Sequence, residues 1–210
     1  MSPMDEPMPA EIEAVQKRRR PARRGEGSQL RSEIIEAARR HVTETGDASS
    51  LSLRSVARAV GVATTSIYLH FHDIGELMSV VKERLFQQFI EMLTSAAVAA
   101  GDDPHARVRA MSLVYVDFGL THPADYYVMF SPLPASMAQG EQVTQQADEA
   151  FDLLREAVAD AVATSEDDDV ALHLWTALHG IVALRKLGTF PWPPVDEQVD
   201  SLLGLLLAPR

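Results

Sequence analysis

Three small hydroxyl side chains, Thr64, Thr65 and Ser66, lie together just after the pair Gly61-Val62. Hydroxyl groups at the N-terminal end of a short helix can approach base edges closely in a DNA major groove. Gly61 can adopt the positive φ that a tight turn between helices requires, and Val62 can close the corner between the helices. The spacing therefore predicts a helix-turn-helix that reads DNA sequence.

Short helices are expected on both sides of this turn. The first covers residues 52–60, because the hydroxyl of Ser52 can cap its N-terminus. The second is expected from Thr64 to Phe71 and carries the three hydroxyls at its start. A preceding helix that begins at Leu30 would complete a three-helix unit.

Helical periodicity continues through most of the remaining sequence. Apolar residues recur at spacings of three and four, and no alternating run bounded by turns suggests a strand. Glycine, proline and polar clusters divide the chain into about nine or ten helices. The expected fold class is all-α. It comprises a disordered basic arm (1–28), a helix-turn-helix DNA-binding domain (29–73) and a helical-bundle ligand-binding and dimerisation domain (74–210).

Charge is distributed unevenly along the chain. The formal net charge is −11, which by itself argues against a polyanionic partner. Residues 17–72, however, hold eleven Lys or Arg against five Asp or Glu, whereas residues 73–210 hold eight against twenty-one. A basic segment attached to an acidic body is typical of a nucleic-acid reader joined to an effector or dimerisation domain.

The composition disfavours several other classes of protein. The chain has no cysteine, so disulfides and thiolate metal sites are excluded. No histidine pair has ligand spacing, and no phosphate loop, nucleophile elbow or carboxylate pair is present, so no enzyme, metal or cofactor is expected. The acids and prolines of residues 1–13 and the lack of a long apolar run predict a soluble, cytoplasmic protein with no membrane partner.

The helix-turn-helix resembles the N-terminal domain of TetR-family regulators over about fifty residues, from Leu30 to Met78. Two positions depart from the family pattern. Ala63 stands where Ser or Thr usually caps the recognition helix, so the cap is expected at Thr64, and Ile74 replaces a lysine that usually contacts phosphate. The matching residues are Val56-Ala57, Gly61-Val62, Ile67-Tyr68-x-His70-Phe71 and Leu77.

The resemblance implies roles for individual residues of this unit. Thr64, Thr65 and Ser66 would face bases, whereas Ser52, Tyr68 and His70 would hold phosphates, and we add Arg54 to the DNA-binding set. Phe71 is expected in the core, and the Tyr68 ring is expected to pack while its hydroxyl reaches phosphate. His70 could instead close the C-terminus of its helix.

A basic run, Lys17 to Arg24, precedes the first expected helix and includes Arg18, Arg19 and Arg20. A flexible arm at this place could reach the adjacent minor groove or the DNA backbone. The alternative is a solvated charge run without a DNA contact. Its position beside a DNA reader favours contact.

Aromatic and methionine side chains are concentrated in the acidic body. A long helix from Asp73 to about Ala100 presents Leu77, Val81, Leu85, Phe89, Met92 and Ala96 on one face. The set suggests an adaptable apolar cavity, with ordinary core packing as the alternative. The candidate ligand-binding residues are Phe89, Met92, Met111, Tyr115, Phe118, Asp117, Trp175 and His179.

Asp117 and the segment around Trp175 extend these expectations. Asp117, the one acid between Ala110 and Ala124, either orients a ligand or pairs with a buried arginine. The run from Trp175 to Gly180, with His179 one turn after Trp175, resembles a subgroup of TetR-like effector domains that carries a Trp, His and Gly signature. The resemblance implies an intersubunit four-helix bundle, which we assign to Phe151–Val162 and Ala171–Leu187.

Two functions from different classes remain open at this point. The first is a dimeric repressor that binds a pseudo-palindromic double-stranded DNA operator and is released by a small, largely apolar effector. The second is a DNA-binding protein without a small-molecule ligand, whose effector domain binds a protein partner and whose aromatic cluster is solid core.

Overall fold

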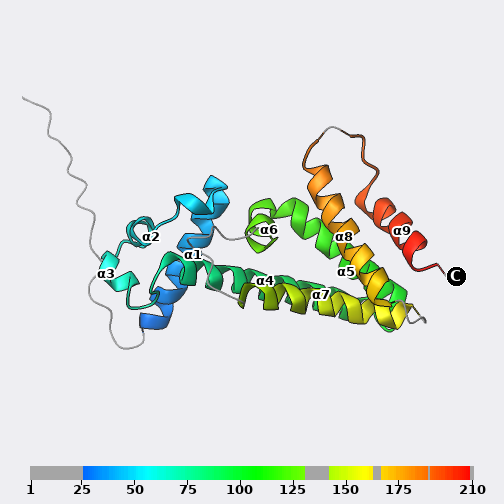
Figure 1. The fold of residues 1–210 in the computed structure, drawn as a ribbon, viewed down its shortest axis with the longest axis horizontal. Coiled ribbons are helices and arrows are strands. Elements are labelled where there is room, and N and C mark those ends of the chain that lie inside the picture. The colour runs from blue at the N-terminus through cyan, green and yellow to red at the C-terminus, as the bar shows by residue number, and fades with distance from the viewer. Residues whose placement is uncertain (1–25, 131–141, 163–166, 189, 209–210) are drawn as a thin grey trace, which may run out of the picture.

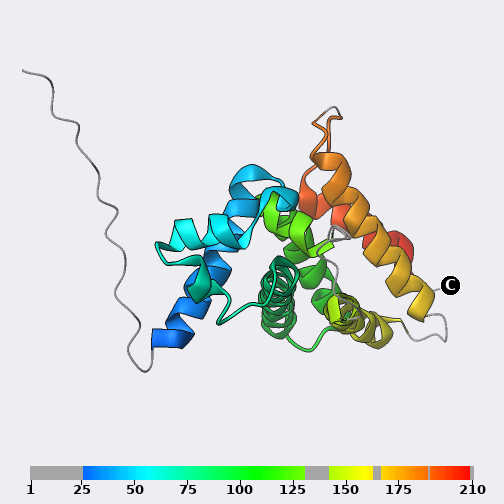
Figure 2. The same ribbon diagram turned by 60° about the vertical axis from the view of Figure 1, so that its left-hand side comes forward.

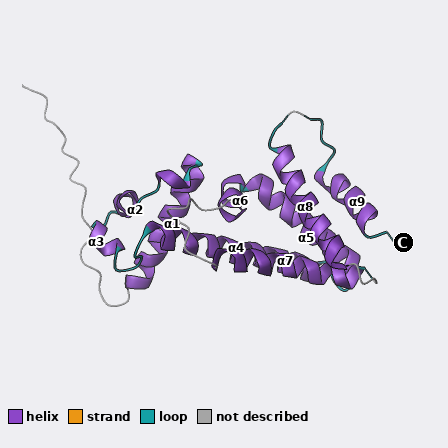
Figure 3. Ribbon diagram, in the orientation of Figure 1, coloured by secondary structure: helices purple, strands orange, loops and turns teal. Residues whose placement is uncertain are grey.

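The computed structural model describes residues 26–130, 142–162, 167–188 and 190–208. Within these ranges every regular element is a helix (Figure 3), which confirms the all-α fold class. The N-terminal unit comprises α1 (Glu26–Thr45), the 3-10 turn η1 (Ala48–Ser50), α2 (Leu53–Val60) and α3 (Thr64–Ile67). The remaining helices are α4 (Ile74–Ala99), α5 (Pro104–Thr121), α6 (Pro123–Phe130), α7 (Gln142–Ala161), α8 (Asp167–Arg185) and α9 (Val195–Leu206).

Local sequence signals account for several helix boundaries. The Ser52 hydroxyl accepts a hydrogen bond from the Ser55 amide at 3.1 Å, and the Ser55 hydroxyl accepts one from the Ser52 amide, so a reciprocal capping box begins α2. Gly61 ends α2 with φ at 77°, a left-handed conformation that glycine adopts without strain. Asp73 caps α4 by accepting from the Glu76 amide. These observations confirm the expected cap, turn and long helix.

Three expectations for the N-terminal unit were wrong. Helix α1 begins at Glu26, so residues 26–28 are helical and do not belong to an arm. Helix α3 ends at Ile67 rather than Phe71, because the His70 amide bonds the Ile67 carbonyl three residues back and tightens the backbone. Ala63 is the N-cap residue of α3 and provides no side-chain bond, and Thr64 is already inside the helix.

The helices are arranged around two lengthwise elements. In Figure 1, α1 to α3 form one end of the molecule, and α4 runs from them along the body with α7 beside it. Helix α6 lies between α1 and the body in Figures 1 and 2, and it contacts both α1 and α4. Among the described residues, none of the helices has the length and apolar character needed to cross a membrane.

One continuous hydrophobic core passes through both domains. In the N-terminal unit it includes Ile34, Val56, Ile67 and Phe71, all at most 1% exposed. Helix α4 then carries it into the body, with Leu77, Val81, Leu85, Phe89 and Leu93 buried on one face. The sequence placed Met92 on this buried face, but the structure buries Leu93 instead and leaves Met92 38% exposed.

Candidate functional site

The three hydroxyls predicted to read bases lie on α3. Ile67 is the buried residue of this short helix, whereas Thr65 is exposed and Thr64 and Ser66 are half-buried. Burial of Ile67 against the core therefore fixes α3 with the Thr65 side chain facing solvent. Its contact with bases stays a prediction.

The side chains predicted to contact phosphate differ in what they bind in the structure, although all three named here are exposed. Ser52 is exposed, and its hydroxyl already caps α2, while Arg54 is exposed on the same helix. Tyr68 is 58% exposed, so the expectation that its ring packs in the core was wrong. The turn after Ile67 carries the ring outward. A hydroxyl on an exposed ring remains suited to a phosphate contact.

Phe71, His70 and the basic arm complete the N-terminal site. Phe71 is 1% exposed, with the Arg31 guanidinium 5.0 Å from its ring centre, which confirms its role in the core. His70 is half-buried, and both of its proposed roles stay open. Arg18, Arg19 and Arg20 lie outside the described residues.

The aromatic residues predicted from the acidic body do lie together. The ring of Phe89 on α4 lies 5.3 Å from Tyr115 and 5.1 Å from Phe118, both on α5. Tyr115 lies 5.2 Å from the Trp175 ring on α8. Trp175 in turn lies 5.2 Å from His179, as their four-residue spacing predicts. Met111 is buried in the core of α5.

Two members of this cluster were left out of the predicted ligand set. Tyr126 and Phe130, both on α6, approach His179, with the Phe130 ring 4.5 Å from the imidazole. Their signal was present, because they belong to the aromatic run that begins at Tyr126. Their place beside His179 depends on how the side chains of α6 reach α8 in the folded chain, which spacing along the sequence does not show.

His179 binds two tyrosine hydroxyls, one with each ring nitrogen. The Tyr115 hydroxyl lies 2.8 Å from Nε2, and the Tyr126 hydroxyl bonds Nδ1. The two hydroxyls are 3.5 Å apart. A neutral imidazole has one N–H donor and one acceptor nitrogen. One tyrosine hydroxyl therefore accepts a hydrogen bond from the ring N–H and donates to the second hydroxyl, and the second hydroxyl donates to the other ring nitrogen.

Burial keeps all three groups neutral. It lowers the pKa of His179 to about 4 and raises the pKa of both Tyr115 and Tyr126. The ring of hydrogen bonds is therefore closed without any charge. In an apolar enclosure, such a ring can exchange one of its bonds for a neutral polar atom of a ligand, but it gives no charge with which to hold an ion.

Asp117 and Met92 do not belong to the aromatic cluster. Asp117 is exposed on α5, and no ion pair in the described part of the chain includes it, so both of its expected roles were wrong. The helical turn places its side chain on the opposite side of α5 from Tyr115, which is buried. Met92 is partly exposed and lines a separate groove.

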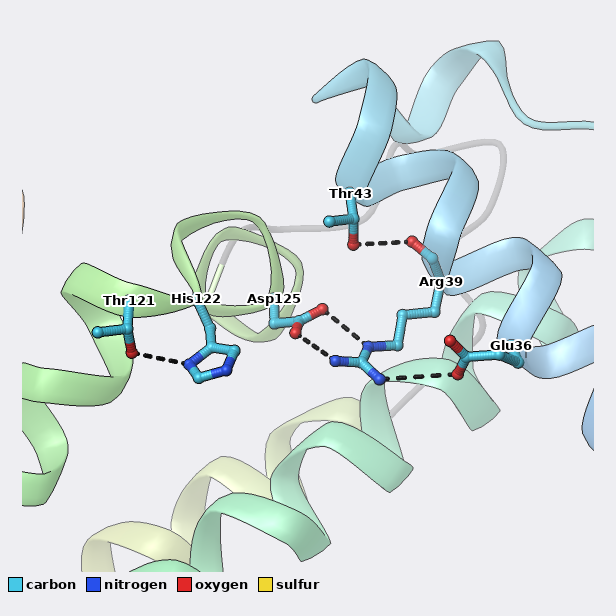
Figure 4. Close-up of polar contacts among 6 residues, drawn as sticks. All are labelled: Glu36, Arg39, Thr43, Thr121, His122 and Asp125. Carbon is cyan, nitrogen blue, oxygen red and sulfur yellow. Dashed lines mark hydrogen bonds and ion pairs between the residues drawn. The ribbon is translucent and has the colours of Figure 1, made fainter.

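The buried acid of this region is Asp125 on α6, and it binds the first helix of the chain. Arg39 on α1 donates from Nε to Oδ1 at 3.0 Å and from Nη2 to Oδ2 at 2.6 Å (Figure 4). Asp125 is 4% exposed. The two residues are 86 positions apart, so no local pattern indicated that they meet. This bidentate pair joins the DNA-reading unit to the body.

The body of the chain is similar to a known family of domains. Residues 108–207 match the family model described as the Tetracyclin repressor-like, C-terminal domain. The HTH-type transcriptional regulator Rv1816 of Mycobacterium tuberculosis is 27% identical over 158 residues, which cover 71% of this chain and 65% of that protein. The chain therefore spans slightly less than two thirds of that regulator's length. Rv0681, an uncharacterized HTH-type regulator of the same organism, is 26% identical over 85% of this chain and 80% of its own length.

Solved structures share the fold. A protein of unknown function from Rhodococcus sp. RHA1 superimposes with a TM-score of 0.74 at 26% identity, over 85% of this chain and 93% of its own. A TetR family transcription regulator from Marinobacter aquaeolei VT8 gives a TM-score of 0.65 at 17% identity, over 88% and 97%. The matched C-terminal domain, the similar HTH-type regulators and the shared architecture together support a TetR-family transcriptional regulator.

Proposed function

We propose that this protein is a transcriptional repressor that binds an operator through α3. The observation that carries the proposal is the rigid turn at Gly61 followed by a short helix that buries Ile67 and exposes Thr65. The positive balance of residues 17–72 supports attraction to a DNA backbone. The names of the mycobacterial relatives are consistent with this activity.

We propose further that a small, largely apolar effector enters the aromatic cluster and lowers operator affinity. The neutral ring of His179, Tyr115 and Tyr126 would supply one or two hydrogen bonds, and the surrounding rings would supply apolar contact. The full burial of Phe89 and Tyr115 favours the second candidate, in which this cluster is solid core and the body binds a protein partner.

A homodimer is the third part of the proposal. Two leucines on α8 are at least half exposed, Leu172 at 54% and Leu184 at 50%; Leu187, in the turn just after α8, is 67% exposed, and Leu205 on α9 is 78% exposed. Exposed apolar side chains on neighbouring helices favour a partner surface. Helix α9 replaces α7 in this assignment, because the apolar residues Ala150, Leu154 and Val158 of α7 are buried within the subunit.

The DNA-binding proposal is tested by selecting bound sites from a random pool and by measuring affinity for the selected site. Thr65→Ala should relax base preference at one or two positions, each by roughly 1–3 kcal/mol of discrimination. Thr94→Ala is the matched control, since Thr94 is exposed on α4. Failure to enrich any sequence would refute sequence-specific binding.

The dimer proposal is tested by sedimentation at micromolar concentration. Leu184→Glu should shift the protein toward a monomer, because a carboxylate in an apolar interface is left unpaired. Val98→Glu is the control, because Val98 is 75% exposed at the far end of α4. A wild-type protein that sediments as a monomer, or a dimer equally weakened by both changes, would contradict the assignment.

A further inference from the structure

A groove lies at the junction of the two domains and shares only Phe118 with the aromatic cluster described above. It has a volume of about 720 Å³ and is lined by side chains of α1, α4, α5 and α6. The Arg39–Asp125 pair forms one wall (Figure 4). A molecule in this groove would therefore touch the contact that joins α1 to α6.

Breaking the Arg39–Asp125 ion pair would have different consequences for the two side chains. Asp125 is 4% exposed, so a ligand that took Arg39 away from it would leave a buried, unpaired carboxylate. The Arg39 side chain is 32% exposed and also lies 3.6 Å from the Glu36 carboxylate. A displaced Arg39 would keep Glu36 and water as partners. This difference favours a cationic ligand, which would take the place of Arg39 beside Asp125. It disfavours an anionic ligand, which would take the place of Asp125 beside Arg39.

The other charged residues that line the groove also favour a cationic ligand. Glu91 is the other acid that lines the groove, and Arg39 is the only Lys or Arg among the lining residues in the described part of the chain. Once Arg39 has turned away, both carboxylates would face the groove. An organic cation would then be held by two acids, one of them buried.

The shape of the wall selects a flat ligand. The rings of Phe118 and His122 are stacked 5.2 Å apart at an interplanar angle of 17°, next to the ion pair. Met92, with its adaptable thioether, lies in the same groove. A planar body can lie against such a wall, and a planar fork of N–H donors can bind a carboxylate with two parallel hydrogen bonds, as Arg39 does here.

We propose that this interdomain groove binds a flat organic cation of the amidine or guanidine class, which replaces the Arg39 guanidinium on Asp125. Binding separates α1 from α6 and loosens the attachment of the DNA-reading unit to the body, which is then made mainly through α4. The effect on DNA rests on the proposed function, since it requires an operator-bound state that the ion pair helps to hold.

Calorimetric titration of the purified protein with benzamidine tests the site itself. Benzamide, which has nearly the same shape but no charge, should bind at least tenfold more weakly. Asp125→Asn should weaken benzamidine binding by at least tenfold, whereas the matched change Asp117→Asn should leave it unaltered, because Asp117 is exposed on α5 outside the groove. Equal binding of benzamidine and benzamide, equal binding to both variants, or no benzamidine binding at concentrations on the order of 10 mM would overturn the site.

Chemical rescue gives an independent readout. Arg39→Ala leaves Asp125 unpaired, so benzamidine should raise the melting temperature of this variant more than that of the wild type, and should not do so for Asp125→Asn. A rise in melting temperature no larger than that of the wild type would contradict the proposal that benzamidine replaces the Arg39 guanidinium. If Arg39→Ala does not fold, the comparison of benzamidine with benzamide on the wild type decides the question.

A final titration measures operator affinity with and without benzamidine. Affinity should fall in the wild type and in Asp117→Asn, and should stay unchanged in Asp125→Asn. Benzamidine that binds Asp125 without altering operator affinity would overturn the coupling while the site stands. Absence of any DNA binding without benzamidine would refute the proposed function, and the calorimetric result would still decide the site.

Discussion

Gly119 lies where α5 crosses α8, immediately beside the hydrogen-bonded ring. A Cβ atom at this position would lie 2.6 and 2.7 Å from the two methyl groups of Val182 and 3.2 Å from Cδ2 of Tyr126. Carbon atoms in contact are normally about 3.5–4.0 Å apart. Gly119→Ala would therefore force α8 or the Val182 side chain to move by roughly 1 Å and would press on Tyr126.

The size of the effect follows from two opposing contributions. Overpacking a buried contact costs about 1–3 kcal/mol, and two contacts below 3 Å place this substitution in the upper part of that range, at about 2–3 kcal/mol. Alanine in place of glycine within a helix returns about 0.8–1 kcal/mol. We expect a net loss of about 1–2 kcal/mol, which for a chain of this length lowers the melting temperature by about 2–8 °C. The displaced Tyr126 should also weaken its bond to His179.

Thermal unfolding of a double-mutant cycle measures this contact directly. Gly119→Ala combined with Val182→Ala should be more stable than the sum of the single changes predicts, because the smaller side chain makes room for the added methyl group. Gly27→Ala is the control, since its Cβ would meet only an ordinary contact at 3.9 Å. Additive effects of the two changes, or a Gly119→Ala variant as stable as the wild type, would refute the close approach of α5 to α8.

Two further predictions concern stability, one from the protonation of His179 and one from the Ser52 cap of α2. Burial lowers the pKa of His179 to about 4 in the folded protein, against an ordinary value of 6.5. The unfolded chain therefore binds a proton there first, and the free energy of unfolding should fall as the pH drops from 6.5 to 4. The loss is at most about 2 kcal/mol at pH 5, reduced by the partial exposure of the ring, and urea titrations should show a shallower pH slope in His179→Phe. Ser52→Ala removes the cap of α2 and should cost about 1 kcal/mol in the same assay. A Ser52→Ala variant with wild-type stability would show that the Ser55 hydroxyl suffices.

Most of what was predictable about the fold depends on short-range chemistry. Ser52 can cap a helix and Gly61 can take a positive φ whatever surrounds them, so the helix-turn-helix could be placed from neighbouring residues alone. The same reasoning placed Trp175 beside His179, since a four-residue step returns to the same helix face. It did not give the end of α3, where the chain tightens after Ile67 as it approaches α4.

The candidate sites depend more on contacts between distant segments. Asp117 and Asp125 are both single acids on apolar helices, yet only Asp125 is buried, because Arg39 reaches it from 86 residues away. Likewise the hydrogen-bonded ring at His179 joins residues 53 and 64 positions apart. The sequence by itself determined the helical class, the cap of α2 and the turn at Gly61, since these need only interactions within a few residues. The tertiary structure alone decided which charges and hydroxyls are buried together, because burial is a property of how the helices pack.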